Sequence, residues 1–147
     1  MVPGLGGHLV SEVFLETLLS TSGALDGDRA RARLAYLRRQ CASLGPATSP
    51  RALLETAAAP MVDLLGFEPP TDIAVVDAVV AATIFKAPRA DSHNLALLVA
   101  PWGERLDPLW RVAVTEAMRR FASWGILFNG THLRIVDPNH LDRQQRL

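Results

Sequence analysis

Lysine, cysteine and histidine are scarce in this chain, and their scarcity narrows the chemistry it can perform. Lys86 is the only lysine, so any reaction that needs a titrating amine must use Lys86, because arginine stays protonated. Cys41 is the only cysteine, which excludes an intrachain disulfide and a cysteine metal cluster. The four histidines are far apart in the sequence and lack the spacing of zinc ligands.

Arginine supplies almost all of the positive charge, and several arginines fall in one predicted helix over residues 28–44. Arg31, Arg38 and Arg39 lie near one another by helical spacing, and such a row could follow a DNA backbone. Arg134 projects from the outer face of a predicted strand, where it could contact a phosphate. An ordinary solvated helix or strand face is the alternative interpretation for each of these arginines.

The total charge does not by itself indicate a nucleic-acid partner. The chain has 15 basic and 15 acidic residues, whereas nucleic-acid binders usually carry a basic excess or stripe. Arg119 and Arg120, on a later predicted helix, could extend the basic patch. The zero net charge favours the competing interpretation of a protein-interaction domain without DNA contact.

The elements that would position these residues begin with helices. Apolar residues at helical spacing predict helices over residues 7–20 and 28–44. Ser49 is typical of an N-cap, and Pro50 then occupies the first position of a third helix. Pro60 lies inside the apolar pattern of that helix, so we expect a kink or a break there.

Beyond Pro69 and Pro70 the chain changes to short aliphatic and β-branched runs, which predict strands. These runs cover residues 73–76, 79–86 and 94–100. The alanine-rich part of the second run also fits a helix. Asp107 and Pro108 then predict the start of an amphipathic helix that continues to about Ser123.

The last predicted element is a β-hairpin over residues 124–137. Two short apolar runs flank Asn129 and Gly130, and an Asn-Gly pair suits a two-residue type I′ turn because both central positions need positive φ. Leu133 and Ile135 would then share one face of the second strand.

The residues of this hairpin resemble the end of a known domain. An aromatic residue and a glycine, an Asn-Gly turn and a following arginine are similar to the end of the nuclease-like domain at the N-terminus of restriction-modification enzymes. That domain has the PD-(D/E)xK nuclease fold. Further matches occur in the same order, at Leu65-Gly66-Phe67, Asp77, Ala100-Pro101-Trp102-Gly103, Leu106-Asp107 and Trp124 to Gly130.

The resemblance implies an α/β fold of restriction-endonuclease-like type, a small mixed β-sheet flanked by helices. The nuclease-like core would cover residues 49–137 of a single domain, with residues 1–48 as an accessory helical layer and residues 138–147 as a tail or linker. In such nucleases, two acids on neighbouring strands bind a divalent metal and a lysine helps to activate water. On this chain the resemblance implies Asp77 and Glu55 as acids and Lys86 as the lysine.

The chain departs from the family where the second acid and the lysine should be. The strand expected to contain Glu-x-Lys reads ALLVA over residues 96–100, and Ile84 stands two residues before Lys86. We therefore expect a catalytically inactive module that assists DNA engagement or enzyme assembly. The alternatives are an active metal-dependent endonuclease with a migrated site, using Asp72 or Asp77 with Glu68 and Lys86, and an interaction or dimerisation domain without DNA contact.

The wider context follows from the same resemblance and from the composition. We expect a bacterial, cytoplasmic protein, the N-terminal module of a restriction-modification or DNA-methyltransferase polypeptide. DNA and the remainder of a larger polypeptide are the expected partners. No apolar run reaches membrane length. We expect no cofactor, except Mg²⁺ if the module is an active nuclease.

Overall fold

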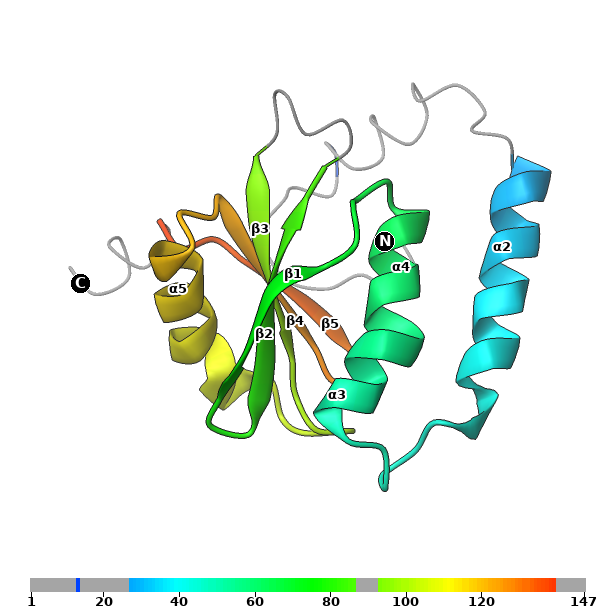
Figure 1. Ribbon diagram of the computed structural model, residues 1–147, viewed down its shortest axis with the longest axis horizontal. Coiled ribbons are helices and arrows are strands. Elements are labelled where there is room, and N and C mark those ends of the chain that lie inside the picture. The colour runs from blue at the N-terminus through cyan, green and yellow to red at the C-terminus, as the bar shows by residue number, and fades with distance from the viewer. Residues whose placement is uncertain (1–12, 14–26, 87–92, 140–147) are drawn as a thin grey trace.

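The computed structural model describes residue 13 and residues 27–86 and 93–139, which form a mixed β-sheet with helices on both faces (Figure 1). The sheet consists of β1 (Thr71–Val76), β2 (Val79–Phe85), β3 (Asn94–Val99), β4 (Trp124–Phe128) and β5 (Leu133–Val136). The main helices are α2 (Gly27–Gln40), α3 (Pro50–Leu53), α4 (Ala59–Leu64) and α5 (Trp110–Arg119). Short helical turns, η1 (Cys41–Ser43), η2 (Leu54–Ala58) and η4 (Asp107–Leu109), adjoin them.

The five strands lie in the order β1-β2-β3-β4-β5. β3 and β4 are parallel, with Leu97 beside Ile126, and every other neighbouring pair is antiparallel. A parallel pair needs a crossover connection, and α5 is the helix that lies between β3 and β4 in the chain. The predicted class, an α/β fold with a mixed sheet flanked by helices, is therefore confirmed.

One face of the sheet packs against the helical segment of α3, η2 and α4. Ser49 caps the segment as predicted, because its side-chain oxygen accepts a hydrogen bond of 3.1 Å from the Ala52 amide. The segment does not break at Pro60. Instead, the turn before Pro60 widens into the π-helical η2, which continues directly into α4. Leu53 and Val62 are fully buried against the sheet.

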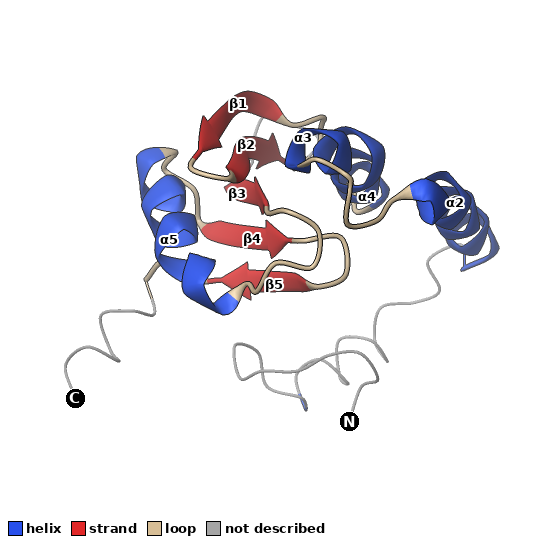
Figure 2. Cartoon of the chain, turned by 90° about the horizontal axis from the view of Figure 1, so that it is seen from below, coloured by secondary structure: helices blue, strands red, loops and turns tan. Residues whose placement is uncertain are grey.

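The other face of the sheet packs against α5, and Figure 2 shows the two helical layers on either side. Small residues make this contact, since Ala113 and Ala117 of α5 pack on Ala81 and Ala96 of the sheet with no solvent exposure. The alanine-rich run that could have been a helix is thus part of β2, a strand covered on both sides. In β2, small side chains allow helices to approach closely.

The hairpin of β4 and β5 exists, but its predicted turn is wrong. The loop between the strands is residues 129–132, and the Asn129 amide donates to the His132 carbonyl at 3.2 Å. Gly130 has φ of +87°, whereas Asn129 does not have a positive φ. Asn129 therefore opens the turn and Gly130 is its first central residue, which differs from a type I′ turn centred on both residues.

Two other boundaries differ from expectation. α5 ends at Arg119 rather than near Ser123, because the chain turns at Phe121, whose φ is +53°. Asp107 does not cap a helix, since its carboxylate pairs with Arg134 of β5. The predicted helix over residues 7–20 and the tail from residue 140 lie outside the described residues.

Candidate functional site

The three predicted catalytic residues do not come together. Asp77 lies in the turn before β2, and Lys86 follows directly after this strand. The 7 residues of β2 separate them, which at roughly 3.3 Å per residue is about 23 Å. Glu55 lies on η2, where its carboxylate is exposed and pairs with Arg51 at 3.0 Å. Asp77 is accordingly a turn residue with φ of +53°, and the implied triad is not assembled.

The alternative acids do not complete a metal site either. Glu68 lies at the same end of β2 as Lys86, because its amide donates to the Phe85 carbonyl at 2.8 Å. Asp72 is the second residue of β1, and its carboxylate is 3.5 Å from the Arg120 guanidinium. Among the described residues, no group of three or more His, Cys, Asp or Glu side chains is arranged to hold a metal ion.

The strand that should contain the second acid is the most completely buried part of the sheet. Ala96, Leu97, Leu98 and Val99 of β3 have no solvent exposure. They pack alternately on the α4 side and the α5 side of the sheet. A carboxylate at these positions would have to be buried in an aliphatic environment, which is costly for a charged group.

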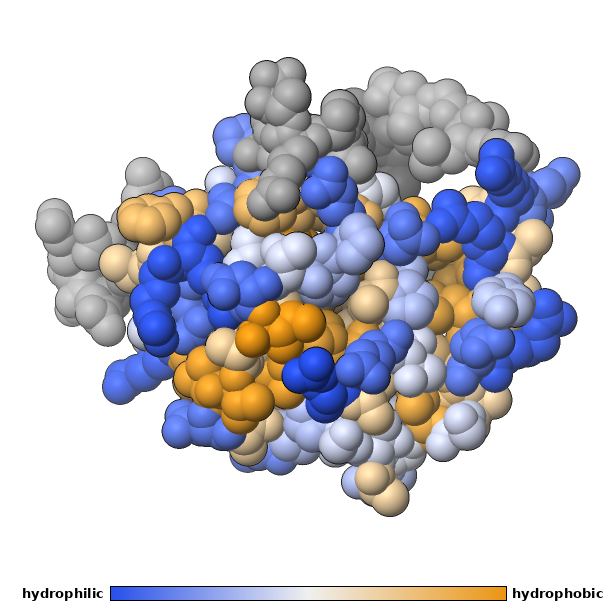
Figure 3. Space-filling view, viewed as in Figure 1, coloured by the Kyte–Doolittle hydropathy of each residue, from blue (hydrophilic) through white to orange (hydrophobic). Residues whose placement is uncertain are grey.

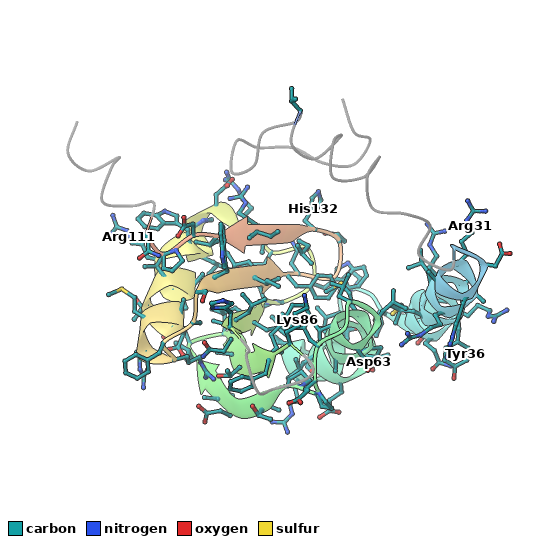
Figure 4. All side chains as sticks on the ribbon, turned by 90° about the horizontal axis from the view of Figure 1, so that it is seen from above. Arg31, Tyr36, Asp63, Lys86, Arg111 and His132 are labelled. Atoms are coloured by element: carbon teal, nitrogen blue, oxygen red, sulfur yellow. The ribbon has the colours of Figure 1, made fainter. Side chains whose placement is uncertain are left out.

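The predicted DNA-binding arginines of α2 are exposed. Arg31, Arg38 and Arg39 lie on a helix that contains no buried residue, and Figure 4 shows Arg31 pointing away from the sheet. Arg33 differs from them because it pairs with Asp63 of α4 at 3.0 Å. This ion pair and the neighbouring apolar contacts fix which side of α2 faces the rest of the protein.

The arginines divide into paired and unpaired groups by location. Outside α2, most described arginines pair with a carboxylate: Arg51 with Glu55, Arg119 and Arg120 with Glu116, and Arg134 with Asp107. On α2, by contrast, Arg29, Arg31, Arg38 and Arg39 make no ion pair with any described residue. Asp28 is the only acidic residue of this helix.

Three arginines predicted to contribute to a basic surface are therefore paired with carboxylates. Arg134, predicted to contact phosphate, donates to the Asp107 carboxylate. This hydrogen bond, followed by the charge of the guanidinium, holds the pKa of Asp107 below its usual range. Arg119 and Arg120 do not extend the α2 patch, because both bind Glu116 at 3.2 Å.

The Glu116–Arg120 pair was missed by sequence reasoning. Both side chains are buried, with exposed fractions of 4% and 7%. Arg120 also donates to the Thr83 hydroxyl at 2.8 Å and to the Asp72 carbonyl at 2.7 Å, so it joins α5 to β1 and β2. The spacing of four residues on a helix is the only sequence signal for this pair, and such spacing is common on exposed helix faces.

Asn129 is a second buried polar residue, at 3% exposure, and it organises the loops at the carboxyl ends of β3 and β4. Its side chain accepts from the amides of Thr131 and His132 at 3.0 and 2.7 Å, and donates to the Glu104 carbonyl at 2.7 Å. Its own carbonyl accepts from the Gly103 amide at 2.9 Å. Asn129 thus links the two glycine-containing motifs that the sequence placed far apart.

A pocket of about 190 Å³ lies beside these loops, between α2 and the sheet. Trp102 and Phe128 line it on the sheet side, and Arg38 and Cys41 line it on the side of α2 and η1. The lining is mostly apolar. Burial raises the pKa of the Cys41 thiol, so this lone cysteine is a weaker nucleophile than a free one. Arg38 belongs both to the pocket rim and to the unpaired arginines.

Comparison with known proteins gives no relationship for this chain: no family model, no curated protein and no solved structure matches it. In the part of the chain that the structure describes, no helix is long and apolar enough to cross a membrane.

Proposed function

We propose that this chain is a catalytically inactive, restriction-endonuclease-like module that binds the DNA backbone through α2. It would serve a restriction-modification or DNA-methyltransferase polypeptide by holding DNA rather than cutting it. The observation that carries this proposal is that four exposed arginines of α2 make no ion pair with any described residue, because exposed guanidinium groups of this kind are available to phosphates.

The order of the elements supports the nuclease-like fold. A helical segment, α3 to α4, precedes the antiparallel meander of β1, β2 and β3, and α5 and β4 follow. The PD-(D/E)xK core has this order of helix, three-stranded meander, helix and strand. The family-like Trp-Gly and Asn-Gly motifs also meet in space, since Trp102 packs on Gly130 and Gly103 bonds to Asn129.

The contents of the strands support inactivity. In the nuclease, adjacent strands place acids and a lysine around one metal. Here β3 contributes only aliphatic side chains to its buried stretch, and Asp77 and Lys86 lie at opposite ends of β2.

The distribution of charge supports a contact with DNA through α2. Outside α2, pairing with carboxylates neutralises four of the described arginines and leaves Arg105 and Arg111, whereas α2 has four arginines without an ion pair to any described residue. Arg31 and Arg38 are seven positions apart, which is close to two helical turns, so they project on nearly the same side. Two guanidinium groups about 10 Å apart along a helix axis can contact phosphates along a groove.

The test compares two double variants with the same loss of charge. Arg31→Gln with Arg38→Gln removes two unpaired arginines, and Arg51→Gln with Arg119→Gln removes two exposed arginines that are already paired. Binding of a fluorescein-labelled duplex is followed by anisotropy over a series of NaCl concentrations in EDTA. Each phosphate contact contributes about 0.9 to the slope of log K against log salt, so we expect the first double variant to lose about 1.8.

The control variant should retain the slope and most of the affinity of the wild-type chain. Equal losses in both variants would show that only total charge matters, and absence of duplex binding by the wild type would favour an interaction domain without DNA contact. The active-nuclease alternative is tested separately by nicking of a supercoiled plasmid with Mg²⁺ or Mn²⁺. Cleavage that disappears in Lys86→Ala would overturn the inactive assignment.

A further inference from the structure

β1 is an edge strand with an unusually apolar exposed surface. It pairs with β2 on one side, and among the described strands it has no neighbour on the other. Ile73 and Val75 are 41% and 72% exposed. Figure 3 shows an apolar area along the course of β1. An unpaired strand edge with apolar side chains is a template for another strand unless charges or a covering segment protect it.

The pairing with β2 indicates which backbone groups face the free edge. Val76 pairs with Val79 across the two-residue turn of Asp77 and Ala78, and such a closing pair exchanges both of its hydrogen bonds. Antiparallel pairs alternate, so the backbone N–H and C=O of Val75 point away from β2. The register shifts between Thr71 and Ala74, so at Ile73 alternation fixes only the carbonyl. This carbonyl shares a peptide plane with the Ala74 N–H, which faces β2, and it therefore points to the free edge.

We propose that a second copy of this chain binds along this edge, with the two β1 strands antiparallel and Ala74 opposite Ala74 of the other copy. This register is the one in which Ile73 of each copy faces Val75 of the other. The outward Val75 N–H of each copy can then donate to the Ile73 carbonyl of the other, while the exposed side chains of these two residues make cross-strand apolar contacts. The two sheets become one continuous sheet. This inference does not depend on DNA binding.

Charge is compatible with this register. Asp72 would face Val76 of the other copy, and Asp77 would face Thr71, so no two acidic residues are directly opposed. A shift by one residue would place Asp72 opposite Asp77, and it would also direct the hydrogen-bonding groups away from each other. The zero formal net charge of the chain adds no long-range repulsion between copies.

The symmetry of the contact also favours a second copy. β5 is the other edge of the sheet, and its Leu133 and Ile135 are 43% and 50% exposed. Pairing of β1 with β5 of another copy would leave one free edge on each side and would continue without limit. Pairing of β1 with β1 uses the same surface on both copies and closes as a dimer.

Additional apolar surface lies at the end of β1. Phe121 is 91% exposed and Met118 is 66% exposed, both at the carboxyl end of α5. Arg120 bonds to the Asp72 carbonyl, which holds this end of α5 beside β1. These side chains add apolar surface on the α5 side of the sheet, whereas Val75, paired with Val80, lies on the α4 side.

The oligomeric state is measured by sedimentation velocity from low to high micromolar concentration. We expect a reversible monomer–dimer equilibrium in the wild-type chain. Val75→Lys should shift it at least tenfold towards the monomer, because a lysine on an edge strand opposes pairing. Ile135→Lys is the matched control, an exposed apolar residue of the other edge strand, and it should leave the equilibrium unchanged.

The register is tested by disulfide trapping in a Cys41→Ser background. Ala74→Cys should form a covalent dimer, because facing residues of a non-hydrogen-bonded pair have Cα atoms about 4.5 Å apart, within disulfide range. Ile73→Cys alone should not, whereas a mixture of Ile73→Cys and Val75→Cys chains should crosslink. A chain that stays monomeric, open-ended growth, loss of the dimer in Ile135→Lys, or efficient self-crosslinking of Ile73→Cys would each overturn the proposal.

Discussion

Substitution of Gly130 by alanine tests the contact that joins the two glycine motifs. Gly130 has φ of +87°, and a Cβ added there would lie 2.6 Å from Cζ3 of Trp102, well inside van der Waals contact. A left-handed backbone costs a residue with a Cβ about 1–2 kcal/mol. Forcing extra volume into a packed contact costs typically about 1–3 kcal/mol more. We therefore expect Gly130→Ala to destabilise the fold by about 2–5 kcal/mol, the sum of these two effects.

Gly103→Ala is the control that separates the two effects. Gly103 also has a positive φ, of +68°, but nothing lies within 4 Å of an added Cβ. It should cost only the backbone contribution, about 1–2 kcal/mol. Urea unfolding, compared at constant m-value, measures both variants. Equal destabilisation by the two substitutions would refute the packing of Trp102 on Gly130. In the Gly130→Ala chain, Trp102→Leu should recover part of the lost free energy of unfolding.

Two further predictions concern carboxylates. Glu116→Ala should lower the free energy of unfolding by about 3–5 kcal/mol, because it leaves the buried Arg120 guanidinium without its main partner. Asp63→Ala, which removes an exposed ion pair, should lower it by less than about 1 kcal/mol. Urea unfolding measures both variants, and equal small losses would contradict the buried pair. Asp107 should titrate below the usual range of aspartate in ¹³C NMR, so its contribution to stability is present above the pKa of the unfolded residue and is lost as the pH falls through the folded pKa. Arg134→Gln should bring that pKa back towards its ordinary value, and an unchanged titration would contradict the ion pair.

Short stretches of sequence correctly predicted those features of the fold that depend only on residues close together in the chain. Ser49 and Pro50 mark a helix start whatever that helix packs against, and the aliphatic runs became β2 and β3 because they can be buried on both faces. Where two local explanations competed, the sheet decided. Asp77 interrupts an apolar run because, with Ala78, it forms the two-residue turn between β1 and β2.

The remaining features depend on partners distant in the sequence. The sequence predicts Asn129 at the centre of a turn. In the structure, Asn129 instead forms hydrogen bonds with the loop that follows β3, which begins about 28 residues earlier at Pro101. Glu116 carries no sequence signal of burial, yet its side chain is buried together with that of Arg120. Hydrophobic periodicity reports which side of a helix is apolar. It does not report that a charge on that side has a partner.

The zero net charge is the sequence property that most misrepresents the surface. Net charge adds all side chains equally, whereas a field near the surface depends on which charges are neutralised by close partners. Glu55, Glu116 and Asp107 each hold arginines outside α2, so the acidic residues do not reduce positive charge evenly over the protein. α2 keeps several arginines and a single aspartate. A neutral chain can therefore present a basic helix, and the argument from total charge against a DNA contact loses its force for this surface.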